Sequence, residues 1–156
     1  MKLIVSFFLF VLISIFCLSC AETKKSTSDK NTAIQKTPDA NLTETYWKLT
    51  ELMGKPVPIT PADKKEVHIK LRKEGNKVEG FGGCNGFGST FVTRNNFNIS
   101  FGTITSTMIA CPELNLENEL FNVLKTVDNY YIKGDTLSFS KAKMATMARF
   151  VAVYFH

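Results

Sequence analysis

The most constraining feature of the sequence is a period-two alternation of apolar and polar residues that begins near Leu42. This period is typical of half-buried β-strands, because successive side chains of a strand point to opposite faces. The alternation is clearest in residues 67–72, 97–101 and 137–140. Turn sequences separate neighbouring runs: Glu74-Gly75-Asn76, Arg94-Asn95-Asn96 and Lys133-Gly134-Asp135. The pattern predicts antiparallel hairpins.

One segment, residues 113–127, has a different period. Its apolar residues recur at spacings of three and four, which is typical of an amphipathic helix. They are Leu116, Leu120, Val123, Leu124 and Val127. We therefore predict an α+β fold, mainly antiparallel β: a small barrel-like sheet of about seven or eight strands with one packed α-helix. The chain of 156 residues has room for one such domain, over residues 42–156.

The N-terminal residues predict export and lipid anchoring. Residues 1–19 carry one lysine and then an apolar run, which is shorter than the ~20 residues of a membrane-spanning helix and typical of a signal peptide. Leu18-Ser19-Cys20 resembles the bacterial lipobox, in which the cysteine is acylated and becomes the first residue. Ordinary cleavage after Ala21 is the alternative.

Residues 20–41 are rich in Lys, Ser, Thr, Asn and Asp, and such a composition is typical of a flexible tether. We expect the membrane partner to be reached through the acyl chains on Cys20, because several chains on one residue anchor stably. Ala21 is not the Asp that retains many lipoproteins at the inner membrane, so a cell-envelope location at the outer membrane is favoured.

Charge argues against nucleic acid as a partner. The formal net charge of the chain is +5, and the part after Asn41 has 14 Lys and Arg against 11 Asp and Glu. These charges are interleaved, whereas nucleic-acid-binding domains gather Lys and Arg on one face.

The stretch from Gly80 to Gly88 reads GFGGCNGFG. It does not match G-x-G-x-x-G or the P-loop pattern, and it lies between strand-like segments rather than before a helix, so a phosphate site is disfavoured. Glycine is better explained here by a tight turn or a close backbone approach.

Once Cys17 is removed with the signal peptide and Cys20 is acylated, Cys84 and Cys111 are the only thiols left. A nucleophilic Cys84 would need a base, and the two histidines are His68, in an alternating run, and His156, the last residue. A zinc site would need three or four ligands, whereas these cysteines would supply only two. An even pair in an exported protein favours a disulfide, with a catalytic thiol and a metal ligand as the remaining alternatives. We expect no catalytic residue, metal or cofactor.

These motifs resemble a known family over about residues 45–155. The matching residues are Gly83-Cys84-Asn85, Thr107-Met108, Ala110-Cys111-Pro112 and Glu119. They resemble the META domain of HslJ-like heat-shock lipoproteins. The resemblance implies a small β-rich envelope domain with one helix and without an established enzymatic activity. The two family cysteines fall on Cys84 and Cys111, which supports a shared structural role.

We therefore expect a non-catalytic, lipid-anchored envelope protein that contributes to heat, envelope or antibiotic stress tolerance by binding or scaffolding. One alternative is a small-molecule-binding module, which predicts an apolar cleft in the β domain. A thiol-dependent enzyme is the other, and it predicts a free, exposed Cys84 beside a basic group.

Overall fold

A computed structural model describes residues 38–58, 60–61, 64–111 and 114–155. The expected signal peptide 1–19, the acylation site Cys20 and most of the tether 20–41 lie outside the described residues. In chain order the elements are β1 (Tyr46–Leu52), β2 (Lys55–Pro56), β3 (His68–Arg72), a 3₁₀ turn (Glu74–Asn76), β4 (Lys77–Phe81), β5 (Gly86–Arg94), β6 (Asn98–Phe101), β7 (Thr105–Ser106), α2 (Leu114–Thr126), β8 (Asn129–Lys133), β9 (Thr136–Ser140) and β10 (Thr146–Val153).

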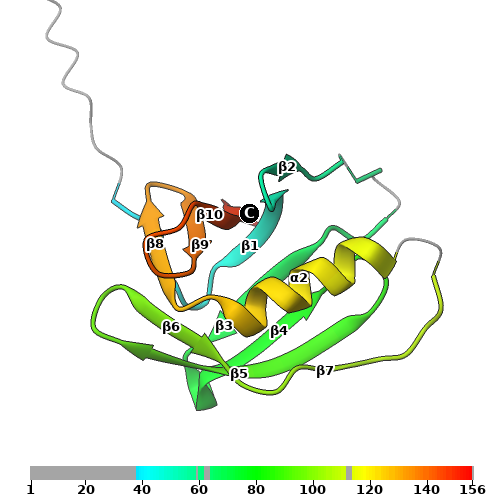
Figure 1. Cartoon of the computed structure of the whole chain (residues 1–156), viewed down its shortest axis with the longest axis horizontal. Helices are drawn as coiled ribbons and strands as arrows, with labels where there is room; N and C mark the ends of the chain where they lie inside the picture. The colour runs from blue at the N-terminus through cyan, green and yellow to red at the C-terminus, as the bar shows by residue number, and fades with distance from the viewer. Residues whose placement is uncertain (1–37, 59, 62–63, 112–113, 156) are drawn as a thin grey trace, which may run out of the picture. The chain divides into compact units, whose positions relative to one another are not determined.

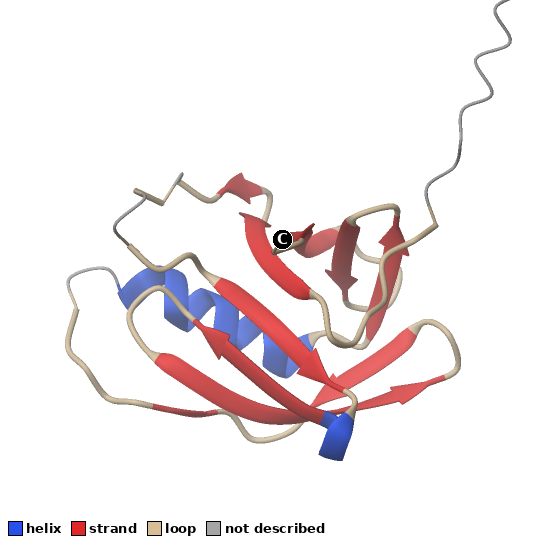
Figure 2. Ribbon diagram, turned by 180° about the vertical axis from the view of Figure 1, so that it is seen from behind, coloured by secondary structure: helices blue, strands red, loops and turns tan. Residues whose placement is uncertain are grey.

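Eight strands form a closed antiparallel barrel. Their order is β1, β10, β9, β8, β6, β5, β4 and β3, and β3 pairs with β1 again. The two-residue strands β2 and β7 pair with β1 and β5 respectively. Figures 1 and 2, seen from opposite sides, place α2 on one side of the sheet formed by β3, β4 and β5. The predicted α+β barrel with one helix is confirmed.

The core follows the predicted alternation in most strands. Val67, Ile69, Leu71, Leu137 and Phe139 are all buried, as are Leu120, Val123 and Leu124 of α2 and Val127 directly after it. The exception lies in the run 97–101. There Phe97 is 60% exposed because it precedes β6 in the β5–β6 hairpin, whereas Ile99 within the strand is buried. No helix in the described part of the chain is long and apolar enough to cross a membrane.

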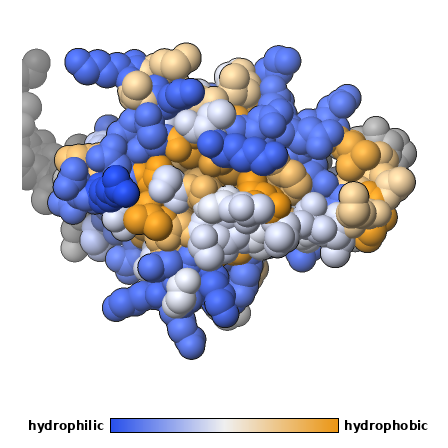
Figure 3. Space-filling model, turned by 60° about the horizontal axis from the view of Figure 1, so that its bottom comes forward, coloured by the Kyte–Doolittle hydropathy of each residue, from blue (hydrophilic) through white to orange (hydrophobic). Residues whose placement is uncertain are grey.

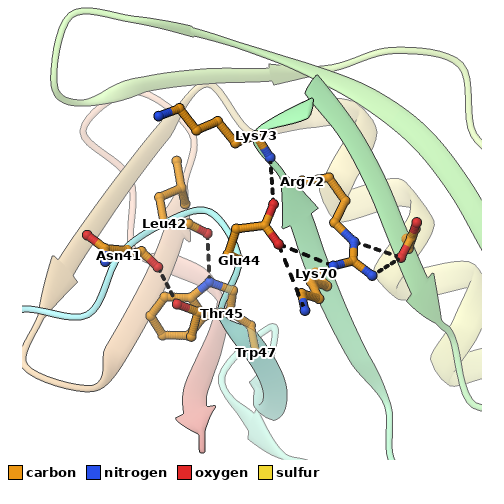
Figure 4. Close-up of polar contacts among 9 residues, drawn as sticks. Asn41, Leu42, Glu44, Thr45, Trp47, Lys70, Arg72 and Lys73 are labelled. Carbon is orange, nitrogen blue, oxygen red and sulfur yellow. Dashed lines mark hydrogen bonds and ion pairs between the residues drawn. The ribbon is translucent and has the colours of Figure 1, made fainter. Parts of the chain in front are cut away.

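The N-terminal entry to the barrel is fixed by polar contacts around Glu44 (Figure 4). Glu44 has a positive φ of 63°. Its carboxylate accepts hydrogen bonds from the backbone N–H of Lys73 at 2.9 Å and from Arg72 at 3.2 Å. The Lys73 N–H, followed by Arg72, lowers the pKa of Glu44. Beside it, the indole of the fully buried Trp47 donates to the carbonyl oxygen of Leu42 at 3.0 Å.

Candidate functional site

The glycine-rich stretch forms a tight turn between β4 and β5. The N–H of Gly82 donates to the carbonyl oxygen of Asn85 at 2.9 Å, and Gly83 has a φ of +117°, a conformation that favours glycine. A Cβ at Gly82 would lie 2.7 Å from the carboxyl group of Glu117, and one at Gly80 would lie 2.5 Å from the Phe87 ring. The glycines of the turn therefore supply a positive φ and close approach, as the sequence predicts.

Glu117 in the first turn of α2 reaches into this turn. Its side chain is 3% exposed. One carboxylate oxygen accepts from the backbone N–H of Asn85 at 2.6 Å and from that of Cys84 at 3.3 Å, and the other accepts from the Asn85 side-chain amide at 2.8 Å. A buried carboxylate is tolerated only when such donors replace water. Glu117 therefore joins the helix to the glycine-rich turn.

Asn85 uses its whole side-chain hydrogen-bonding capacity, which is two donors and two acceptor positions. Its amide nitrogen donates to Glu117 and, at 3.2 Å, to the carbonyl oxygen of Ile109. Its amide oxygen accepts from the Thr107 hydroxyl and from the N–H of Ile109, both at 2.8 Å. Asn85 is 3% exposed. It therefore connects the turn, the helix and the segment before the helix.

A disulfide joins Cys84 to Cys111, with the two Cα atoms 5.9 Å apart. The bridge confirms the pairing that the sequence favours over a free thiol and a metal ligand. It ties the glycine-rich turn to the same segment that Asn85 holds. Cys84 is 8% exposed, so the bridge is largely shielded on that side.

The segment 107–110 is displayed to solvent although its backbone is held. All four of its residues are exposed, and Met108 and Ile109 are 98% and 60% exposed. The Thr107 N–H donates to the carbonyl oxygen of Gly86 at 3.1 Å, and Asn85 holds both backbone groups of Ile109. We call residues 107–110 the braced loop. It presents two large apolar side chains from a fixed backbone.

The residues singled out by the family resemblance are only partly brought together. Gly83 lies in the glycine-rich turn, Asn85 and Thr107 are joined by a hydrogen bond, and Met108 and Ala110 follow Thr107 in the braced loop. Pro112 lies outside the described residues. Glu119 is on α2 and is partly exposed, whereas Glu117, which the sequence analysis did not single out, is the buried acid.

The described polar groups at this site are hydrogen-bonded to one another. Within residues 38–58, 60–61, 64–111 and 114–155, no buried side-chain nitrogen or oxygen lacks a hydrogen-bond partner. The same residues contain no group of three His, Cys, Asp or Glu side chains that could hold a metal ion. The arrangement suits a structural brace that positions the braced loop.

A second feature is a groove on the outer surface of β4 and β5. It comprises two pockets of about 580 and 610 Å³, which share Glu79, Gly88 and Thr105. A separate pocket of about 500 Å³ lies near the start of α2, between Val57, Pro61, Phe81 and Leu116. The barrel interior itself is filled by fully buried side chains, including Trp47, Phe139 and Phe150.

His68 lies at one end of the outer groove. The alternation predicts that it points to solvent, and it does lie on the outer side of β3, but its side chain is only 9% exposed because the Tyr46 ring stacks on it at 4.3 Å. Its Nδ1 lies 2.8 Å from the carbonyl oxygen of Glu66, so a neutral ring carries the proton on that nitrogen. Burial, helped by the charge of Lys65, lowers the pKa of His68.

The depressed pKa of His68 gives an expected pH dependence of stability. The unfolded chain takes up the proton first as pH falls below about 6.5, so the free energy of unfolding decreases through this window until the folded His68 also protonates. The contribution of Glu44 to the free energy of unfolding is lost at lower pH, because its pKa is below that of an ordinary carboxyl group. Urea unfolding at pH 7.5 and 5.5 should show a smaller decrease for His68→Phe, which keeps a ring against Tyr46. An equal decrease would assign the effect to other groups.

Comparisons with known proteins support the fold. A family model described as META domain matches residues 40–154. An NMR structure of a protein from Burkholderia xenovorans aligns with a TM-score of 0.57 and 21% identity, covering 72% of this chain and 83% of that one. A second NMR structure aligns with a TM-score of 0.52 and 24% identity, covering 69% and 88%. At these identities the likeness concerns the fold alone. Comparison with curated proteins gives no match.

Proposed function

Because the chain belongs to the META domain family, we propose that it is a non-catalytic, lipid-anchored cell-envelope protein of the HslJ type. It contributes to tolerance of heat, envelope or antibiotic stress by binding another envelope component. Attachment is through acyl chains on Cys20, at the outer membrane where the cell has two. The lipobox-like Leu18-Ser19-Cys20 and the polar tether that follows are the support for the anchor.

The braced loop is the observation that carries the binding role. An isolated exposed apolar residue is ordinary, but Met108 and Ile109 are adjacent and lie on a backbone fixed by Asn85 and the disulfide. A fixed backbone lowers the entropy lost when a partner binds. Methionine also adapts its shape to different apolar surfaces. The loop therefore has the properties of a preorganised apolar contact.

The same network supports a non-catalytic role. Nucleophilic catalysis by Cys84 would need a free thiolate, whereas its sulfur is bonded to Cys111. The buried Glu117 carboxylate accepts three hydrogen bonds from the turn, so its oxygens are turned away from solvent and toward the protein. The side chains with the strongest chemistry in the motif are thus engaged in holding the loop.

A complementation experiment tests this function. A strain without the gene should regain survival under heat, detergent or antibiotic stress with the wild-type gene and not with Met108→Ser/Ile109→Ser, because the apolar contact is removed. Met144→Ser is the matched control, since Met144 is 66% exposed on a different turn. Full complementation by the loop variant would contradict the proposed contact.

The anchor is tested on the same strains by the intact mass of the membrane-extracted protein. The account expects cleavage before Cys20, acyl chains on that residue, and loss of membrane attachment in Cys20→Ala. A mature protein that begins after Ala21 and carries no acyl mass would contradict the lipid anchor and indicate a secreted protein.

A further inference from the structure

The outer groove contains two glycines that the fold does not explain. Gly86 and Gly88 alternate with the buried Phe87 in β5, so they lie on the outer surface. Neither has a positive φ. A Cβ at Gly86 would have its nearest neighbour at 3.9 Å, and one at Gly88 at 3.7 Å, which are ordinary contacts. This differs from Gly80 and Gly82, where a Cβ would collide with buried groups.

Glycine weakens a strand by roughly 0.5–1 kcal/mol relative to a residue with a side chain. Two such positions on one strand face, without a steric reason, leave a floor that stays open. What the two glycines do provide is space, because Gly88 lines both pockets of the groove and Gly86 lines one of them. The groove therefore has a role that the barrel itself does not require.

Hydroxyl groups line this open floor. They belong to Ser89, Thr90, Thr103, Thr105, Ser106 and Thr107. The hydroxyls of Ser89, Thr105 and Thr107 donate to Gly102, Gly88 and Asn85 within the protein, so they offer a ligand their acceptor positions. A hydroxyl donates one hydrogen bond and accepts others, so a row of them suits a ligand that itself carries many hydroxyls. Figure 3 turns the lower side of the barrel in Figure 1 forward and shows a pale band of intermediate hydropathy between apolar and hydrophilic areas.

The backbone of the floor is already paired. β4 pairs with β3 and β5, and at Phe87 and Gly88 β5 pairs with both β4 and β7. A peptide that binds by strand addition needs free backbone groups at a sheet edge, and the floor of the groove does not offer them. Recognition must come from side chains, which favours a hydroxylated ligand over an extended peptide.

The charges of the groove favour an acidic ligand. Lys65 lines one of the two pockets and Lys77 lines the other. Within the described residues, neither lysine is in an ion pair with Asp or Glu. The acid between them, Glu79, receives two contacts of 3.0 Å from Arg72, so its charge is already compensated. The Lys65 ammonium lies 5.1 Å from the centre of the Phe81 ring, a contact that leaves its net charge in place, so both lysines complement carboxylate groups on a ligand.

From these observations we propose that the outer groove of β4 and β5 binds a linear glycan whose sugars carry carboxylates. The open glycine floor takes the sugar rings, the hydroxyl row contacts their hydroxyls, and Lys65 and Lys77 pair with carboxylates at the two ends. The paired strand length from Phe81 to Lys77 is about 13 Å, which is long enough for a short oligosaccharide. This site is separate from the Met108 contact.

Three probes of six units each test the ligand class on the full chain in neutral detergent. They are hexagalacturonate, maltohexaose, which is an uncharged α-1,4-linked hexasaccharide, and hexaglutamate, which has the charge without the sugar. With selective ¹⁵N-glycine labelling, hexagalacturonate should shift the amide signals of Gly86 and Gly88. Gly54 and Gly134, which do not line the groove, should stay unchanged. Calorimetry should give at least about tenfold weaker binding of the other two probes.

Substitutions separate the groove from the fold. Gly88→Val fills the floor, and its Cβ would meet only ordinary contacts of 3.7 Å or more. The variant should therefore weaken hexagalacturonate binding about tenfold or more while leaving the unfolding midpoint unchanged or higher. Lys65→Ala and Lys77→Ala should each weaken binding, and Lys125→Ala on α2 should not. The proposal is overturned by unchanged binding in Gly88→Val, by equal binding of hexaglutamate or maltohexaose, or by no binding of hexagalacturonate. Each of these outcomes concerns the groove alone. The proposed function is tested separately, by complementation with Met108→Ser/Ile109→Ser.

Discussion

Asn85→Asp is expected to destabilise the protein by about 3–5 kcal/mol at pH 7. The substitution keeps the size of the side chain but removes the two amide donors to Glu117 and Ile109. It also places a second carboxyl group where 2.8 Å now separates the Asn85 nitrogen from a Glu117 oxygen, in a site that is almost closed to water. Guanidinium unfolding with the disulfide intact measures the loss.

Two further variants make this prediction specific. Asn118→Asp is the matched control, because Asn118 is exposed on the same helix, and its effect should stay within about 0.5 kcal/mol. Asn85→Asp/Glu117→Gln restores one donor and one acidic group to the pair and should recover part of the loss. If Asn85→Asp costs less than about 1 kcal/mol, the network does not hold the turn as described.

Loss of the Cys84–Cys111 disulfide has the second-largest expected effect. The two cysteines are 27 positions apart, and a cross-link over such a loop is worth about 3.5 kcal/mol in the chain-entropy account. Cys84→Ala/Cys111→Ala should therefore unfold at a clearly lower guanidinium concentration than the oxidised wild type.

The reduced wild type provides the comparison for this variant. It should unfold close to the double variant, because both lose the same cross-link and retain the Asn85 and Glu117 hydrogen bonds. Equal stability of oxidised and reduced wild type would mean that the network alone fixes the turn, and the brace would then not depend on the disulfide.

The sequence predicted the barrel well because the signals for it are local. The alternation places Ile69 and Leu71 inside, and the turn sequences mark where β3, β5 and β8 end. Phe155 shows where this reasoning fails. The apolar run 150–155 favours a strand that is covered on both faces or paired in the middle of a sheet. β10 is paired on both sides, with β1 and β9, but it ends at Val153 and Phe155 is 76% exposed.

The site was harder to predict, because its key acid does not look like a core residue. Glu117 in the first turn of α2 is easily explained by the helix dipole alone. The position of Glu117 along the helix would have predicted its burial. Glu117 precedes Leu120 by three residues and Leu124 by seven, so it lies on the same helix face as these buried leucines. Glu119, which the family resemblance singled out, is off that face.

The outer groove could not have been found from the sequence. The sequence alone does not distinguish the glycines of the stretch 80–88. In the structure, Gly80 and Gly82 are needed for close packing, whereas Gly86 and Gly88 are not. That difference depends on which groups stand opposite each strand position in the folded barrel. Pairing of β7 with β5 through two residues is likewise too short to leave a sequence pattern.

The central claim is that Asn85 and the disulfide hold the braced loop still while it displays Met108. Native-state hydrogen exchange of the Ile109 amide in the oxidised full chain tests it most directly, because Ile109 is 60% exposed and its N–H is held by the Asn85 side chain. The account predicts that this amide is strongly protected in the wild type and loses its protection in Asn85→Asp. Exchange at the rate of a free loop in the wild type would contradict it.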